Sequence, residues 1–279
     1  MNARLFVGDQ VVQAPAPDDR GLAYGDGLFE TMRVHRGTLP WWDAHWTRLA
    51  QGAARLRLPL PDPCQVRREA AALFADAGDG DGDGDSGDGV LKLLVSRGSG
   101  GRGYAPPPVA VPAWQLSRHP LPPAPRDGLQ LRWCETRLAW QPALAGLKHC
   151  NRLEQVLARM ECIDAAVDEG LMLDADDSVL GAVSANLFVL HGEQWRTPSL
   201  DRCGVAGICR AQLLPRLDAI ETRLAVADID SADAVFLCNA VRGILPVARL
   251  GDRSWPPHAA IAAARRELAR LHPGFASPE

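Results

Sequence analysis

The chain opens with alternating apolar and polar residues, the two-residue period that is typical of β-strands. Turn residues interrupt this alternation at Gly8 and Asp9, and again at Arg36 and Gly37. Glycine is common in tight turns because it adopts left-handed backbone conformations at low cost. We therefore expect two β-hairpins near the start of the chain, one around each turn.

Helical spacing of apolar residues follows the second expected hairpin. Asp43 is the expected N-cap of a first helix that ends before Pro59, and a second helix is expected over residues 66–77. Two later apolar runs predict strands over residues 90–98 and 109–116. Together these elements predict a first domain made of a mixed sheet and two helices.

A proline-rich stretch, residues 119–128, predicts a linker between a small N-terminal domain, residues 1–118, and a larger domain, residues 129–279. The larger domain mixes strands and helices without an internal repeat, so we expect a two-domain α+β fold. Its helices are expected over residues 151–162 and 204–217 and near the C-terminus. Its strands are expected over residues 129–136, 169–174, 178–190, 193–198, 234–239 and 244–250.

Composition places the chain among folded proteins, because 47% of its 279 residues are hydrophobic and 23% are charged. The net charge of -4 gives no basic field for nucleic acid or an anionic membrane, so neither is an expected partner. No apolar run is long enough for a transmembrane helix or a secretory signal. The seven cysteines form no CxxC pair, so we expect reduced thiols, no metal site and a cytoplasmic location.

One segment, residues 78–89, repeats glycine and aspartate. Its first half is similar to a calcium-binding loop, but Val90 stands at the twelfth position, where such a loop needs a bidentate glutamate. The composition instead predicts a flexible acidic loop between a helix and a strand. We expect activity to survive the deletion of residues 79–88.

Primary amines are scarce in this chain. Only Lys92 and Lys148 are lysines among 30 basic side chains, so amine chemistry has two candidates. A lysine becomes a nucleophile when burial or nearby cations lower the pKa of its amine. Lys148 lies just before a predicted helix, where a surface position and a reactive amine both fit the pattern. Lys92 falls at a polar position of a predicted strand, where a solvated side chain is the simpler interpretation.

Two glycine-rich stretches could also carry chemistry. Gly204 and Gly207 lie where a loop becomes a helix, a place where backbone amides can hold a phosphate and where glycines also serve simple turns. Arg97 and Arg102, in SRGSGGRGY, could bind substrate carboxylates or face solvent. His45 has no partner at metal-ligand spacing, so we expect it to have a packing or capping role.

Several blocks of the sequence, in the same order along nearly the whole chain, resemble the fold-type IV pyridoxal-phosphate enzymes, which include branched-chain and D-amino-acid aminotransferases. The blocks YGDGLFE and NLF are shared across that family. The blocks SRGSGGRGY and KHCNRLEQ resemble its aminodeoxychorismate lyase branch. This resemblance implies a homodimer whose subunits hold pyridoxal 5'-phosphate between a small and a large domain.

The resemblance also implies roles for individual residues. Lys148 matches the lysine that binds the cofactor covalently, and Arg48 in HWTRL matches the arginine that binds the cofactor phosphate. The other phosphate contacts would come from the start of a helix and from a later loop, at Gly207, Ile208, Cys209 and Asn239.

The implied reaction converts 4-amino-4-deoxychorismate to 4-aminobenzoate and pyruvate, a step toward folate. Lys148 would take a proton from the amine-bearing ring carbon and return it to the departing enolpyruvate. Arg97 and Arg102 would bind the two substrate carboxylates, and Tyr24 and Thr31 would line the same space. Two alternatives stay open: a fold-type IV aminotransferase for branched-chain or D-amino acids, and a relative that has lost catalysis.

One position departs from the family pattern. The family has an acidic residue beside the pyridine nitrogen, five positions before the asparagine of NLF, and this chain has Gly181 there. Loss of that carboxylate weakens the electron sink of the cofactor. A lyase should suffer less than a transaminase because its product gains an aromatic ring, so Gly181 favours the lyase. The acidic residues that could substitute are Asp174, Asp176, Asp177 and Glu193.

Overall fold

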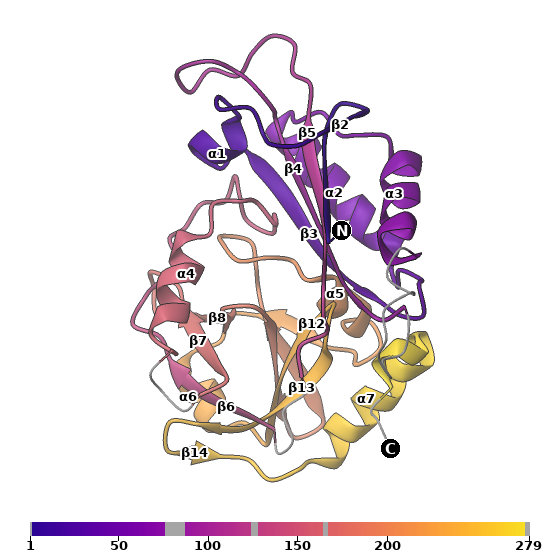
Figure 1. The fold of residues 1–279 in the computed structure, drawn as a ribbon. Helices are drawn as coiled ribbons and strands as arrows, with labels where there is room; N and C mark the ends of the chain where they lie inside the picture. The colour runs from indigo at the N-terminus through magenta and orange to yellow at the C-terminus, as the bar shows by residue number, and fades with distance from the viewer. Residues whose placement is uncertain (1, 76–86, 124–127, 164–166, 277–279) are drawn as a thin grey trace. The chain divides into compact units, whose positions relative to one another are not determined.

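The computed structural model describes residues 2–75, 87–123, 128–163 and 167–276. The chain divides into two compact units, each with its own sheet (Figure 1). The first unit is Met1–Pro122 with Leu147–Asn151, and the second is Pro123–Gly146 with Arg152–Glu279. The short segment 147–151 thus packs with the first unit, although it follows the expected linker in sequence. The first unit is therefore not one continuous stretch of the chain.

The first unit is built on an antiparallel sheet with apolar side chains on one face. Its strands are β1 (Ala3–Val7), β2 (Gln10–Val12), β3 (Gly27–Val34), β4 (Gly89–Ser96) and β5 (Ala113–His119). Its helices are α1 (Arg20–Tyr24), α2 (Trp42–Leu56) and α3 (Pro63–Ala75). The strand order is β2-β1-β5-β4-β3. Residues of α2 and α3 pack with one face of the sheet in a core that includes Leu28, Leu91 and Trp114.

The two expected hairpins have different outcomes. The first is confirmed, since Val7 pairs with Gln10 across its turn. The second is confirmed only at its turn, where His35 and Thr38 pair antiparallel across Arg36 and Gly37. Its expected second strand is wrong, because β3 pairs along its whole length with β4 and the residues after the turn enter α2. Local pattern identifies a turn, but the choice of a strand partner depends on distant residues, and Pro40 interrupts the expected return strand. Asp43 lies in the first turn of α2, whose N-cap is Trp41.

The second unit holds a larger mixed sheet. Its strands are β6 (Leu129–Trp133), β7 (Glu169–Leu173), β8 (Val179–Ala182), β9 (Asn186–His191), β10 (Gln194–Pro198), β11 (Ile220–Thr222), β12 (Ala234–Asn239), β13 (Gly243–Leu250) and β14 (Arg253–Ser254). Its helices are α4 (Leu153–Met160), α5 (Ile208–Leu213), α6 (Val226–Asp230) and α7 (Ala259–Leu271), and a 3-10 turn covers Pro273–Phe275. The strand order is β11-β10-β9-β12-β13-β6-β7-β8, and β8 also pairs with β9. The mixture of strands and helices in both units confirms the predicted α+β class.

Two elements of the second unit differ from the prediction. Residues 178–190 form two strands, β8 and β9, because the chain turns at residues 183–185 and Ala182 N–H donates to the Ala185 carbonyl at 2.9 Å. The helix expected over residues 204–217 is shorter, since α5 ends at Leu213. Pro215 follows that end and has no N–H with which to continue the helix.

The glycine and aspartate segment lies mostly outside the described residues, which resume at Gly87. Asp88 is described and has a structural task, because its Oδ1 accepts from Arg36 N–H at 2.6 Å and its Oδ2 lies 3.1 Å from His35 Nδ1. The deletion expected to be harmless must therefore stop before Gly87. Within the described ranges, no three His, Cys, Asp or Glu side chains gather as a metal site would require. No helix in those ranges is long and apolar enough to cross a membrane.

Candidate active site

Lys148 lies in the first unit, on the segment 147–151 that runs beside β3. Its carbonyl accepts from Phe29 N–H at 2.9 Å, and Cys150 N–H donates to the Gly27 carbonyl at 2.9 Å. The Lys148 amine lies over the Phe29 ring, with Nζ 4.3 Å from the ring centroid. An aromatic face attracts an ammonium group. Backbone pairing and this ring together fix the position of the amine predicted to carry the chemistry.

Glu30 lies on the opposite face of β3 from Phe29, because successive side chains of a strand point to opposite faces. Its carboxylate is 1% exposed and accepts from Arg48 Nε at 2.8 Å and also from Arg48 Nη2. His45 Nδ1 lies 2.6 Å from the same carboxylate. His45 and Arg48 stand three residues apart on α2 and so share one face of the helix. Glu30 therefore orients Arg48, the arginine predicted to bind phosphate.

The protonation states of this Glu30 cluster follow from its partners. Burial alone would raise the pKa of Glu30, but the hydrogen bonds from His45 and Arg48 and the charge of Arg48 outweigh burial and hold that pKa below its ordinary value. Burial lowers the pKa of His45 despite its contact with Glu30, and the charges of Arg48 and Lys148 act in the same direction. His45 Nε2 is buried and finds no hydrogen-bond partner among the described residues. A neutral ring that donates from Nδ1 avoids burying an unsatisfied N–H at Nε2.

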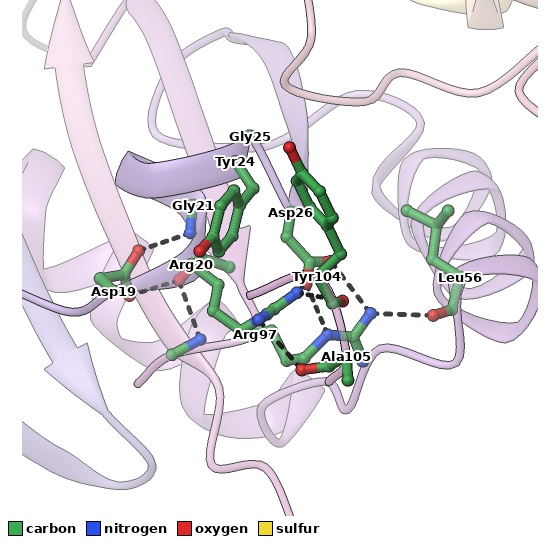
Figure 2. A network of polar contacts seen from close by, with 12 residues as sticks. Asp19, Arg20, Gly21, Tyr24, Gly25, Asp26, Leu56, Arg97, Tyr104 and Ala105 are labelled. Carbon is green, nitrogen blue, oxygen red and sulfur yellow. Dashed lines mark hydrogen bonds and ion pairs between the residues drawn. The ribbon is translucent and has the colours of Figure 1, made fainter. Parts of the chain in front are cut away.

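A second carboxylate, the half-buried Asp26, also joins two basic side chains (Figure 2). Asp26 accepts from Arg20 Nε at 2.8 Å and from Arg97 Nε at 2.7 Å and Nη2 at 2.9 Å. Arg97 also donates to the carbonyls of Arg57 at 2.7 Å and Leu56 at 3.0 Å, where α2 ends. These bonds satisfy carbonyls that the end of a helix leaves open. The prediction that Arg97 binds a substrate carboxylate is therefore corrected: this guanidinium, 7% exposed, is a structural anchor.

Arg20 extends this Asp26 cluster to the loop that carries Arg102. Its guanidinium donates to the carbonyls of Gly103 at 2.9 Å, Tyr104 at 2.9 Å and Ala105 at 3.3 Å. It also lies 4.9 Å from the centroid of the Tyr24 ring. The Tyr24 hydroxyl accepts from Gly103 N–H at 3.0 Å. The backbone beside Arg102 is thus held in place while the Arg102 side chain stays exposed.

Thr31 is not part of this loop contact. It lies half-buried on β3, directly opposite Lys92 of β4. Of the four residues predicted to meet the substrate, the structure therefore brings Tyr24 to the Arg102 loop and places Thr31 beside Lys92.

The predicted phosphate contacts of the second unit lie at the start of α5. Gly207 is the N-cap of this helix, and no described side chain caps it. A Cβ at Gly207 would stand 1.9 Å from Asn186 Oδ1, so only glycine fits there. The Cys209 thiol is fully buried, and burial, followed by contact with Cys238, raises its pKa well above the ordinary value. The side chain of Cys209 therefore belongs to the core, which leaves its backbone N–H as the group that a phosphate could use.

The Asn239 side chain makes backbone hydrogen bonds that the sequence did not predict. Its Oδ1 accepts from Val241 N–H at 3.0 Å and Arg242 N–H at 2.8 Å, and its Nδ2 donates to the Ser184 carbonyl at 3.4 Å. The side chain thus shapes the turn between β12 and β13 and ties it to the turn between β8 and β9.

Position 181 cannot simply regain the acidic residue of the family pattern. Gly181 has a φ of +151°, and a Cβ there would stand 2.9 Å from the Ala185 carbonyl oxygen, so any side chain is strained. The four acidic residues that could substitute are all engaged or exposed in turns. Asp174 accepts from Trp140 Nε1, Asp176 pairs with Arg202, Asp177 pairs with Arg137, and Glu193 is exposed between β9 and β10.

Sequence reasoning missed a buried acid, Glu169, at the start of β7. Ser184 Oγ donates to its carboxylate at 2.5 Å, and the Ser184 carbonyl accepts from Asn239. Burial raises the pKa of Glu169, although the hydrogen bond from Ser184 opposes that rise. An acid at the start of a strand usually faces solvent, but the run EGLML is buried at all five positions, and its apolar character was the available signal.

These groups fit the cofactor that the sequence predicts. Lys148 offers an amine and Arg48 a guanidinium held by Glu30, both in the first unit. The start of α5 offers uncapped backbone N–H groups in the second unit. An amine, a guanidinium and helix-terminal N–H groups are the donors that an aldehyde with a phosphate tail requires.

Comparison with known proteins gives the same family over most of the chain. Residues 27–250 match the model of the family described as amino-transferase class IV. An aminodeoxychorismate lyase of Vibrio harveyi is 37% identical over 238 residues, covering 82% of this chain and 84% of that protein.

Solved structures agree with this match. The 4-amino-4-deoxychorismate lyase of Pseudomonas aeruginosa is 44% identical, with a TM-score of 0.86 over 95% of this chain and 98% of that one. A hypothetical aminotransferase of Mycobacterium tuberculosis in its PLP-bound form shares the fold at 22% identity, with a TM-score of 0.78 over 98% of each chain. The protein therefore belongs to the class IV amino-transferase family, whose enzymes use pyridoxal phosphate.

Proposed function

We propose that this protein is a pyridoxal-phosphate-dependent aminodeoxychorismate lyase, which converts 4-amino-4-deoxychorismate to 4-aminobenzoate and pyruvate in the synthesis of folate. The observation that carries the proposal is the match to two proteins named as this lyase, at 37% and 44% identity over more than four fifths of the chain. The placement of Lys148 against β3 supports it, because the reaction needs one well-positioned amine.

Pyridoxal phosphate, when bound, supplies a sink for the electrons left on the amine-bearing carbon of the substrate. Lys148 Nζ takes the proton from that ring carbon and later gives a proton to the methylene carbon of the departing enolpyruvate. The carbon–oxygen bond to the ring breaks, pyruvate leaves and the ring becomes aromatic. One residue can perform both transfers because, after it removes the first proton, its amine carries the proton that it later donates.

The lyase is favoured over an aminotransferase by the surroundings of Gly181. A carboxylate beside the pyridine nitrogen would strengthen the electron sink, but the backbone at position 181 leaves no room for one. The formation of an aromatic product lowers the demand on that sink. An aminotransferase has no comparable gain, so the same glycine would slow it more.

Substrate binding is assigned to Arg102, Tyr24 and Thr31. Arg102 stands exposed on a loop that Arg20 and Tyr24 hold by its backbone, so its guanidinium is available to a carboxylate. Thr31 lies on the same strand as Phe29, whose ring contacts the Lys148 amine.

We also propose that the protein is a homodimer that uses α4. Four apolar side chains of this helix recur at the spacing of one helical face and are 46% to 77% exposed. They are Leu153, Val156, Leu157 and Met160. An exposed apolar face of this kind marks an association surface. In sedimentation equilibrium, Leu157→Glu should shift the protein toward monomer, whereas Ile220→Glu, at an apolar position 50% exposed on β11, should not.

A cytoplasmic location completes the proposal. All seven cysteines are free thiols, which suits a reducing compartment.

The experiment that tests the function offers two reactions to the same holoenzyme preparation. Aminodeoxychorismate, generated in place by a separate synthase, should yield 4-aminobenzoate and pyruvate in equal amounts, and the apoenzyme without added pyridoxal phosphate should yield neither. Branched-chain or D-amino acids with 2-oxoglutarate should give much slower turnover. Fast transamination without 4-aminobenzoate would contradict the proposal and support the aminotransferase.

A further inference from the structure

The structure brings the only two lysines of the chain to one aromatic ring. Lys148 Nζ lies 4.3 Å from the centroid of Phe29, and Lys92 Nζ lies 5.4 Å from the same centroid. The two nitrogens therefore lie no farther apart than these two distances together. The strand pattern alone predicts only that Lys92 points away from the core, whereas the structure places it beside the amine assigned to proton transfer.

Lys92 lies on the face of the first unit's sheet that points away from α2 and α3. It pairs directly with Thr31 of β3 on one side and with Ser117 of β5 on the other. None of the strand positions surrounding it on this face carries a carboxylate. These positions are Phe29, Thr31, Arg33, Val90, Leu94, Gln115, Ser117 and His119.

Among the residues that the structure describes, no carboxylate pairs with the charge of Lys92. Within the described ranges, the Lys92 ammonium makes no salt bridge, and its recorded contact is with the Phe29 ring. Most ion pairs of the first unit use arginine, and those of Arg20, Arg48 and Arg97 are largely buried. Lys92 is exposed instead. An exposed ammonium among uncharged and basic neighbours attracts anions, and the attraction grows as solvent is displaced.

We propose, on the basis of the lyase function above, that Lys92 binds a carboxylate of the substrate while Lys148 works at the amine-bearing carbon. Aminodeoxychorismate carries one carboxylate on its ring and one on its enolpyruvyl group, each a few bonds from that carbon. An amine separation that cannot exceed these two ring distances together suits such a molecule. Branched-chain amino acids and D-alanine carry a single carboxylate, so Lys92 selects for dicarboxylates. Lys92 is thus a specificity residue, and Thr31 is one of its two direct cross-strand partners.

The test compares Lys92→Gln, Lys92→Arg and the control Arg118→Gln as holoenzymes. Arg118 is a matched control because its guanidinium also lies over a phenylalanine ring, 5.1 Å from the centroid of Phe74, and it is placed on neighbouring β5. The readouts are KM and kcat for aminodeoxychorismate and the Kd for chorismate, a dicarboxylate with a hydroxyl in place of the reacting amine, measured by equilibrium dialysis.

Lys92→Gln should raise KM and the chorismate Kd by about 10- to 100-fold, the range for loss of one charge-assisted hydrogen bond. Lys92→Arg should restore most of this affinity, which a misfolded variant would not do. Arg118→Gln should match the wild type, and the cofactor absorbance should be the same in all four proteins. Added salt should weaken chorismate binding to the wild type more than to Lys92→Gln.

Two results would overturn the inference without touching the proposed function. The first is an unchanged KM and chorismate Kd in Lys92→Gln with cofactor retained. The second is a Lys92→Arg variant as weak as Lys92→Gln. Failure of the wild type to make 4-aminobenzoate would instead contradict the lyase function, and chorismate binding would still report on Lys92.

Discussion

Two carboxylates of the first unit, the half-buried Asp26 and the buried Glu30, have the same kind of partners but different contacts beyond them. Asp26 and Glu30 stand four residues apart, and each joins two basic side chains. The arginines on Asp26 also donate to five backbone carbonyls, so they hold a helix end and a loop. Arg48 donates to Glu30 from both Nε and Nη2, and its charge and that of Lys148 both act on His45. Ion clusters of similar composition can thus hold backbone segments in place or orient a predicted binding group.

The largest difference should appear in stability. Asp26→Asn should lower the free energy of unfolding by about 3–5 kcal/mol, because two largely buried guanidinium groups lose their counter-charge. Urea denaturation monitored by tryptophan fluorescence would measure it. Asparagine keeps the shape of aspartate but not its charge. A decrease of less than about 1 kcal/mol in the free energy of unfolding would mean that the backbone carbonyls alone stabilise the guanidinium groups of Arg20 and Arg97.

Glu30→Gln should cost less stability, about 1–3 kcal/mol, because only Arg48 loses a charged partner when His45 is neutral. Its main effect should be on the cofactor. We expect the Kd for pyridoxal phosphate, followed by absorbance, to rise about tenfold because Arg48 is no longer oriented. If Glu30→Gln lost much stability but kept its cofactor affinity, Glu30 would have the same structural role as Asp26, which would contradict the proposed difference.

Acid should distinguish both carboxylates from Glu169. The pKa values of Asp26 and Glu30 are lowered, so their contribution to stability is present above the unfolded value near 4 and is lost as the pH falls through the folded values. Burial raises the pKa of Glu169 in the folded protein. The free energy of unfolding should therefore increase as the pH falls from 7 toward the pKa that Glu169 has in the unfolded chain. Glu169→Gln should remove this increase in urea titrations at stepped pH. A steeper increase in the variant would contradict the assignment.

The smallest effect should come from the glycine and aspartate segment. Deletion of residues 79–86 should leave kcat and KM within about twofold of the wild type, because this composition contributes little apolar packing. Asp88→Asn is the informative comparison, since it weakens the contacts to Arg36 and His35 and should cost about 0.5–1.5 kcal/mol of stability. A deletion that abolished activity would give the segment a role.

The sequence predicted most periodic elements and offered Lys148 as the candidate reactive lysine, but it did not predict the partners of charged residues. Period and turn residues located the first hairpin, and the resemblance located Lys148. Arg97 and Arg102 look alike in one glycine-rich motif, and only the fold shows that one is an anchor and the other exposed. Lys92 was recognisable as a polar strand position. Its contact with the same ring as Lys148 depends on the pairing of β3 with β4, which is a long-range choice.

The central claim, that Lys148 makes this protein a lyase, is tested most directly by 4-aminobenzoate formation in wild type and Lys148→Ala with saturating pyridoxal phosphate. The account predicts product from the wild type and none above background from Lys148→Ala, with the variant still folded by its urea transition. Turnover by Lys148→Ala comparable to the wild type, or no product from a wild type that binds the cofactor, would contradict it.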